Sequence, residues 1–306
     1  MSRLFRRCAL AIQARFNAFD PAIARYDATR VDGDDAPIFI VGTPRSGSTL
    51  LYQVMLQQFR LAYISNLMAL VPRHMVKLGR WFPSLVFGYS GRLHRGDLGF
   101  VPGLAGPSET GKVMDAWFAG DAGTAEREQI RRTIAAISAI AGAPVLIKSL
   151  SLFSKLAEVQ AIFPSCRFVH LRREPLFVAQ SILLNRRESR HPAEQWRGVE
   201  PEGYAGLAQA SEEYRAVWQV LTIAQEVSVG LRAAGDRVTV LDYGEFCARP
   251  RQALARIGGQ LSLATRDDAP ALPEAFPQAD RVRVDAATWA ALEAAYQDIA
   301  GARDQL

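Results

Sequence analysis

The sequence is poor in cysteine, in lysine and in long apolar runs. Three cysteines in 306 residues, none at metal-ligand spacing, exclude a disulfide framework and a cysteine-bound metal site. No uninterrupted apolar run reaches the roughly 18 residues that a membrane-spanning helix needs. Arginine supplies most of the basic residues behind a net charge of +5. With 49% hydrophobic residues and little net charge, the chain is not disordered; it suits a soluble, cytoplasmic enzyme with an anionic ligand.

The N-terminal residues predict an amphipathic helix over 3–19. Gln13 and Arg15 interrupt its apolar run, and no small-residue cleavage site follows, so it does not read as a signal peptide. We expect this helix to pack on the domain, with peripheral contact to a membrane surface as the alternative. Its apolar residues recur at helical spacing, at Leu4, Cys8, Ile12, Phe16 and Phe19.

Short apolar segments bounded by turn residues predict a buried parallel sheet. Helical patterns alternate with them, which predicts one domain over residues 1–306, with its core over about 37–260. The fold class is α/β: a three-layer sandwich around a central, mainly parallel sheet of the P-loop nucleotide-binding type. Residues 60–120 break the alternation with aromatic side chains and predict an irregular or helical insertion that acts as a substrate wall or lid. The four predicted strands are Pro37–Val41, Pro144–Lys148, Arg167–Leu171 and Val238–Asp242.

The strongest motif is a glycine-rich turn between the first strand and its helix. Gly42 and Gly47 allow the backbone to wrap closely around an anion, which the first helical N–H groups also attract. Arg45 adds a fixed positive charge. Nucleoside-triphosphatase loops have a lysine directly after the second glycine, but here that position holds Ser48. This argues against ATP or GTP turnover and for a nucleotide that ends in a single 5′-phosphate group.

The turn resembles the 5′-phosphosulfate loop of sulfotransferases, enzymes that use 3′-phosphoadenosine 5′-phosphosulfate (PAPS). In that family a Pro-Lys/Arg-Ser-Gly-Thr/Ser-Thr string joins the first strand to its helix, and residues 44–49 match it at every position. The arginine in the basic position is similar to the bacterial, carbohydrate and tyrosylprotein branches. The resemblance implies a donor-binding turn made of Thr43, Pro44, Arg45, Ser46, Gly47, Ser48 and Thr49.

A second motif follows the third strand. Arg173-Glu174-Pro175 resembles the family's 3′-phosphate element, a strand ending in Arg-Asp-Pro with a serine eight positions beyond the arginine. Arg173 and Ser181 have that spacing, and two helical turns bring both to one phosphate. Glu174 is a conservative replacement. Further along, Tyr243-Gly-Glu245 resembles a late family segment for which we expect a packing role.

Sulfuryl transfer requires neutralisation of charge on the leaving phosphate and a clamp on the sulfuryl oxygens. It requires no metal. We expect Arg45 to supply the neutralising charge. Lys148 ends an apolar strand that resembles the family's strand bearing a transition-state lysine, which implies that Lys148 clamps the sulfuryl oxygens.

The reaction also requires a base for the acceptor hydroxyl. The cytosolic branch of the family places a histidine two residues after the lysine, where this chain has Leu150. Other branches use a glutamate, and Glu109 in the aromatic insertion is therefore the predicted base. Asp115 is the first alternative, followed by His74 and His94.

These observations predict an enzyme that transfers a sulfuryl group from PAPS to a hydroxyl or amine acceptor. The arginine-type loop and the insertion around Glu109 favour a carbohydrate, as a glycan or glycolipid. A P-loop kinase-like phosphotransferase and a non-catalytic PAPS-binding protein stay open as alternatives. Positive charge is spread along the chain without an aromatic-basic module, so no nucleic-acid partner is expected.

Overall fold

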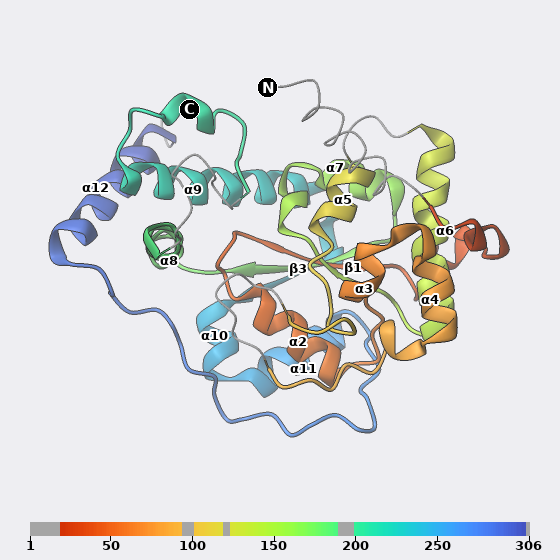
Figure 1. Cartoon of the computed structure of the whole chain (residues 1–306). Helices are drawn as coiled ribbons and strands as arrows, with labels where there is room; N and C mark the ends of the chain where they lie inside the picture. The colour runs from red at the N-terminus through yellow and green to blue at the C-terminus, as the bar shows by residue number, and fades with distance from the viewer. Residues whose placement is uncertain (1–18, 94–100, 119–122, 189–198, 304–306) are drawn as a thin grey trace.

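The computed structural model describes residues 19–93, 101–118, 123–188 and 199–303 (Figure 1). All but one residue of the helix predicted over 3–19 lie outside this part of the chain, as does His94. Within the described ranges, no helix has both the length and the apolar character needed to cross a membrane.

Four parallel strands form the predicted sheet, in the spatial order β2-β1-β3-β4. Each lies within two residues of its predicted bounds. The register aligns Ile40 of β1 with Lys148 on one side and with Val169 on the other. The α/β prediction is therefore confirmed. The strands are β1 (Ile38–Gly42), β2 (Leu146–Lys148), β3 (Arg167–Arg172) and β4 (Val238–Asp242).

Helices cover both faces of the sheet because its strands are apolar on both sides. Strand alternation sends Ile40 and Leu171 to one face, and Phe39 and Phe168 to the other. The first face, below the sheet in Figure 1, packs on α2 (Ser48–Gln58), α10 (Tyr243–Ala248) and α11 (Pro250–Gln260). The second face packs on α5 (Gly111–Trp117), α6 (Thr124–Ala141), α7 (Leu156–Ile162) and α9 (Glu212–Leu231).

A further apolar cluster joins helices beyond the carboxyl end of β3, at the left of Figure 1. It consists of α8 (Pro175–Glu188), α9 and α12 (Ala286–Arg303). Short 3-10 turns connect the larger elements: η1 (Pro21–Arg25), η2 (Ala28–Asp32), η3 (Pro72–His74), η4 (Pro83–Leu85), η5 (Leu150–Ser154), η6 (Tyr204–Leu207) and η7 (Arg232–Arg237).

The insertion over 60–120 is helical and partly integrated into the core. It contains α3 (Asn66–Leu70), α4 (Met75–Trp81) and α5. Ala62 runs beside β2, since its N–H donates to the carbonyl of Pro144 at 2.9 Å and its carbonyl accepts from Leu146 at 2.8 Å. Its role as a substrate wall or lid stays a prediction. Several of its aromatic side chains are buried, among them Tyr63, Tyr89, Trp117 and Phe118.

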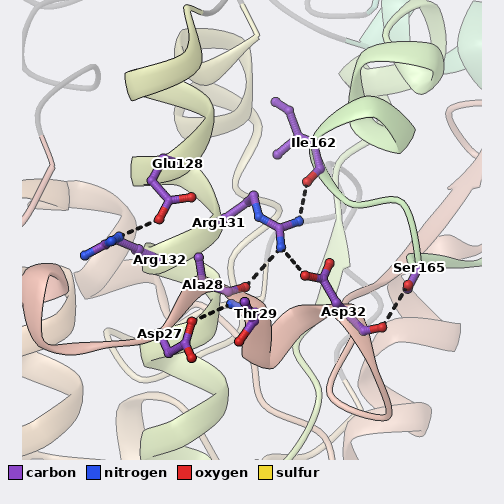
Figure 2. A network of polar contacts seen from close by, with 9 residues as sticks. All are labelled: Asp27, Ala28, Thr29, Asp32, Glu128, Arg131, Arg132, Ile162 and Ser165. Atoms are coloured by element: carbon purple, nitrogen blue, oxygen red, sulfur yellow. Dashed lines mark hydrogen bonds and ion pairs between the residues drawn. The ribbon is translucent and has the colours of Figure 1, made fainter.

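Arg131 of α6 fastens the N-terminal turns to the helical layer (Figure 2). Its guanidinium donates to the Ala28 carbonyl at 3.2 Å and pairs with the Asp32 carboxylate at 2.5 Å. It also donates to the Ile162 carbonyl at the end of α7, at 2.7 Å. Because Ile162 precedes β3, this network lies at the amino edge of the sheet and leaves the carboxyl edge for other groups.

Candidate active site

At two positions, the turn after β1 has a backbone conformation that is accessible only to glycine. Gly42 has φ +152°, and a Cβ there would lie 2.4 Å from the Leu171 carbonyl oxygen of β3. Gly47 has φ +92°, and a Cβ there would lie 2.5 Å from the ring of Tyr243. Arg45 between them also has a positive φ, of 65°. This unusual backbone leads into the N-terminus of α2, which is the geometry of an anion cradle.

Substitution of Gly47 by alanine will destabilise the protein more than the same change at Gly103. Gly103 has nearly the same φ, +93°, but no atom of the described residues lies within 4 Å of its Cβ position. Gly103→Ala therefore carries only the left-handed backbone cost, about 1–2 kcal/mol. Gly47→Ala adds the clash with Tyr243, about another 1–3 kcal/mol. Urea unfolding of both variants measures the difference; equal losses would contradict the contact with Tyr243.

The residues of the two predicted phosphate motifs meet at one place. The Arg45 Nε donates to the Ser181 Oγ at 3.1 Å. The Arg173 guanidinium donates to the backbone carbonyl of Arg45 at 2.5 Å. The loop after β1 and the segment after β3 are thus joined directly, and one small ligand can touch both.

Arg173 also has two contacts that the sequence did not reveal. Its guanidinium pairs with the Asp280 carboxylate at 2.7 Å and lies 4.5 Å from the centroid of the Tyr243 ring. Tyr243, expected only to pack, thus supports Gly47 and Arg173 together. The buried Gln180 fixes the segment after Asp280, because its side-chain amide accepts from the Arg283 N–H at 2.6 Å. No motif in the sequence pointed to Asp280 or Gln180.

Lys148 is buried beside the same turn. Its side chain is 1% exposed, its Nζ donates to the Thr49 hydroxyl of α2 at 2.9 Å, and it pairs with the Glu109 carboxylate. Burial, and secondly the charge of Arg45, lower the pKa of Lys148 to about 7, although the adjacent carboxylate favours the ammonium form. Two groups predicted for catalysis therefore lie in direct contact.

Glu109 is presented by a strained loop. Its side chain is 42% exposed and reaches Lys148 from the segment before α5. The next residue, Thr110, has a φ of 54°, which is unfavourable for a β-branched residue. The Ser108 Oγ accepts from the Thr110 N–H at 3.1 Å, and the Ser108 N–H donates to the Ile64 carbonyl at 2.8 Å. Such local strain is typical of functional segments.

The alternative bases lie elsewhere. Asp115 of α5 hydrogen-bonds Ser151, and burial raises the pKa of its carboxyl. His74 lies exposed at the start of α4. A further histidine, His170 of β3, was not among the predicted bases; it is half-buried, and burial together with the charge of Arg172 lowers its pKa to about 4. Of the candidate bases among the described residues, Glu109 is the one paired with Lys148.

The site fits an anionic ligand with two charged ends. The Ser46 hydroxyl is fully buried in the turn and has no hydrogen-bond partner among the described residues. Arg45 belongs to that turn, Lys148 contacts Thr49 just after it, and Arg173 contacts its backbone at the Arg45 carbonyl. No group of three His, Cys, Asp or Glu side chains in the described ranges is arranged to hold a metal ion.

Comparisons with known proteins show the family and the fold of the chain. A family model described as the sulfotransferase family matches residues 37–267. The structure is similar to sulfotransferase STF9 from Mycobacterium avium, with a TM-score of 0.51 at 15% identity over 87% of this chain and 69% of that one. Sulfotransferase STF1 from Mycobacterium tuberculosis H37Rv gives a TM-score of 0.47 at 17% identity, over 76% and 69% of the two chains. No curated protein matches the sequence.

Proposed function

The chain belongs to the sulfotransferase family, and on that premise we propose that it transfers the sulfuryl group of PAPS to a hydroxyl or amine of a carbohydrate acceptor. The observation that carries the proposal is the contact between the two phosphate motifs, Arg45 with Ser181 and Arg173 with the Arg45 carbonyl. It places two anion-binding groups at one carboxyl edge of a parallel sheet, where ligands bind in such folds.

Each end of the donor has its own residues. Arg173 and Ser181 bind the 3′-phosphate, and Tyr243 holds the Arg173 guanidinium in place beneath it. Arg45, the Ser46 hydroxyl and the N–H groups at the start of α2 bind the 5′-phosphosulfate. In this arrangement Arg45 neutralises the charge that develops on the leaving phosphate.

Lys148 and Glu109 act on the transferred group. The Lys148 ammonium binds the sulfuryl oxygens, and the Glu109 carboxylate accepts the proton of the acceptor hydroxyl. The bond from sulfur to the phosphate oxygen breaks as the bond from sulfur to the acceptor oxygen forms. Glu109 pairs with Lys148 in the free protein. When the donor binds, its sulfuryl group replaces Glu109 as the partner of Lys148, and the Glu109 carboxylate can then contact the acceptor hydroxyl.

Arg173→Gln will remove the preference for a nucleotide that carries a 3′-phosphate. A charged contact of this kind contributes about 1.5–3 kcal/mol, which is roughly a ten- to hundredfold change in Kd. Calorimetric titration with 3′,5′-diphosphoadenosine and with AMP measures the preference. Arg251→Gln, an exposed arginine on α11, is the matched control. A variant that still discriminates between the two nucleotides as the wild type does would show that Arg173 is not the 3′-phosphate ligand.

Binding of PAPS at pH 8 will take up close to one proton. Lys148, with a pKa of about 7, is mostly neutral at that pH, and an adjacent anion raises the pKa of Lys148 again. At pH 6 the lysine is already protonated and uptake is small. Calorimetry in two buffers of different ionisation enthalpy counts the protons. The signal should disappear in Lys148→Met; uptake that persists in that variant would assign the proton to another group.

Incubation with labelled PAPS and acceptors grouped as glycans, lipids, phenols and peptides tests the function directly. Transfer of label to glycans supports the full proposal. Transfer to another group of acceptors supports sulfotransferase activity but contradicts the carbohydrate acceptor. Tight donor binding without transfer to any acceptor would favour a non-catalytic PAPS-binding protein. Magnesium-dependent ATP turnover would favour a kinase, although Ser48 occupies the position of the nucleotide-binding lysine.

A further inference from the structure

A cavity of about 510 Å³ lies on the face of the sheet away from α2. Its walls come from the carboxyl half of β3, from the edge strand β4 and from α9 and η7. Val240 of β4 is 48% exposed within it, whereas the β1 and β2 positions on this face, Phe39, Val41 and Ile147, are buried under helices. The helical layer thus leaves this corner of the sheet open. The apolar part of the wall includes Pro175, Ala224, Leu231, Val238 and Val240.

The charged groups of the cavity are all basic. Besides Arg173 of the proposed donor site, the exposed Arg172 of β3 and Arg232 of η7 line it, and no described aspartate or glutamate contributes to its wall. Among the described residues, neither Arg172 nor Arg232 forms an ion pair. Asp242 lies opposite Arg172 in the strand register, but its carboxylate accepts from the Glu245 N–H at 3.0 Å and caps α10. Two guanidinium groups are therefore available to an anion that enters from solvent.

The cavity borders the proposed donor site, because Thr43 and Arg173 also contribute to its wall. Strand alternation directs His170 and Arg172 to the face opposite Leu171, which packs with the α2 layer. The Arg173 guanidinium instead pairs with the Asp280 carboxylate and lies over the Tyr243 ring. His170 is neutral at physiological pH, because its pKa is lowered to about 4, and so offers a hydrogen-bonding imidazole without a charge.

We propose that this cavity binds an amphipathic organic anion: a small apolar body seated against Leu231, Val238 and Val240, with one carboxylate, sulfate or phosphate group held by Arg172 and Arg232. A volume of about 510 Å³ suits a small organic molecule. Paired guanidinium groups bind such anionic heads through charge-assisted hydrogen bonds. The cavity shares Thr43 and Arg173 with the proposed donor site, but Arg172 and Arg232, which would hold the anionic group, are not assigned to the donor or the base.

The probe for the test is 8-anilino-1-naphthalenesulfonate, an aromatic sulfonate whose fluorescence rises in apolar surroundings. It is titrated into the full-length protein with 3′,5′-diphosphoadenosine present in excess, so that the donor site is occupied. We expect saturable binding at one site and an affinity at least tenfold lower in the double variant Arg172→Gln/Arg232→Gln. Ser228→Trp, which places a large side chain in the cavity wall, should weaken binding as well.

Two controls make the result decisive. Arg251→Gln removes an exposed arginine on the other face of the molecule and should leave the probe affinity unchanged. The uncharged analogue N-phenyl-1-naphthylamine should bind the wild type more weakly and should not respond to the double variant. Circular dichroism confirms that each variant is folded. Equal affinity of the sulfonate for the wild type and the double variant, or equal affinity of the charged and uncharged probes, would overturn the proposal.

Discussion

Lys148→Met will reduce sulfuryl transfer by about 10²–10³-fold in kcat, the effect typical of removing one donor to a developing anion. Methionine has nearly the same volume as lysine and fills the same buried position, so the change isolates the charge and the hydrogen bond to Thr49. Because Lys148 contacts Thr49 and Glu109 rather than Arg173 or Ser181, we expect its loss to affect the transferred group rather than the 3′-phosphate. Donor affinity should therefore change much less than kcat. Steady-state kinetics with PAPS and the acceptor found in the panel measures both.

The same variant should be at least as stable as the wild type. Folding lowers the pKa of Lys148 from 10.5 to about 7, so the buried position disfavours the protonated side chain, and this cost is fully present below pH 7 and disappears above pH 10.5. Methionine removes that cost, and Glu109 is exposed enough to be solvated without its partner. Lys155→Met, at an exposed lysine paired with Glu158, is the matched control and should keep full activity. An inactive Lys148→Met variant that also unfolds at much lower temperature would indicate a structural role instead.

Local chemistry in the sequence was enough to predict the sheet and the glycine-rich turn after β1. The strands are short apolar runs with turn residues at their ends. A short run that is apolar at every position is typical of a parallel strand that is buried on both faces. The turn was predictable because its glycines are required by its own backbone: Gly42 faces the Leu171 carbonyl across one strand pair. Parallel topology then predicted that Arg173 and Arg45 would share one edge, and the structure places them in contact.

Contacts that depend on how the C-terminal segment and the insertion pack against the sheet were not predictable. Asp280 reaches Arg173 across 107 positions, and only the packed C-terminal segment shows that the guanidinium has a carboxylate partner in the free protein. Tyr243 belongs to a recognisable motif, but its contact with Gly47 depends on how α10 docks beside α2. The contact between Glu109 and Lys148 likewise depends on the insertion, whose aromatic residues show no period that a sequence argument can use.

Glu109→Gln will reduce kcat by about 10²–10⁴-fold, the usual contribution of a general base. The glutamine keeps the size of the side chain and a hydrogen bond to Lys148 but cannot accept the acceptor proton. Affinity for 3′,5′-diphosphoadenosine should be unchanged, because the residues proposed to bind it are Arg45, Arg173 and Ser181, and not Glu109. Kinetics and calorimetry on the same preparation separate the two quantities.

The variant Asp115→Asn tests whether Asp115 or Glu109 is the base. Asp115 has the raised pKa that favours a base, but its hydrogen bond goes to Ser151, whereas Glu109 touches the lysine proposed to hold the sulfuryl group. Proximity to the reacting group takes precedence over basicity, because a base must lie within hydrogen-bond reach of the proton it removes. We therefore expect Asp115→Asn to keep most of the activity and the wild-type pH profile. A large loss in Asp115→Asn with an active Glu109→Gln would move the base to α5 and leave Glu109 as a partner that holds Lys148 in the free protein.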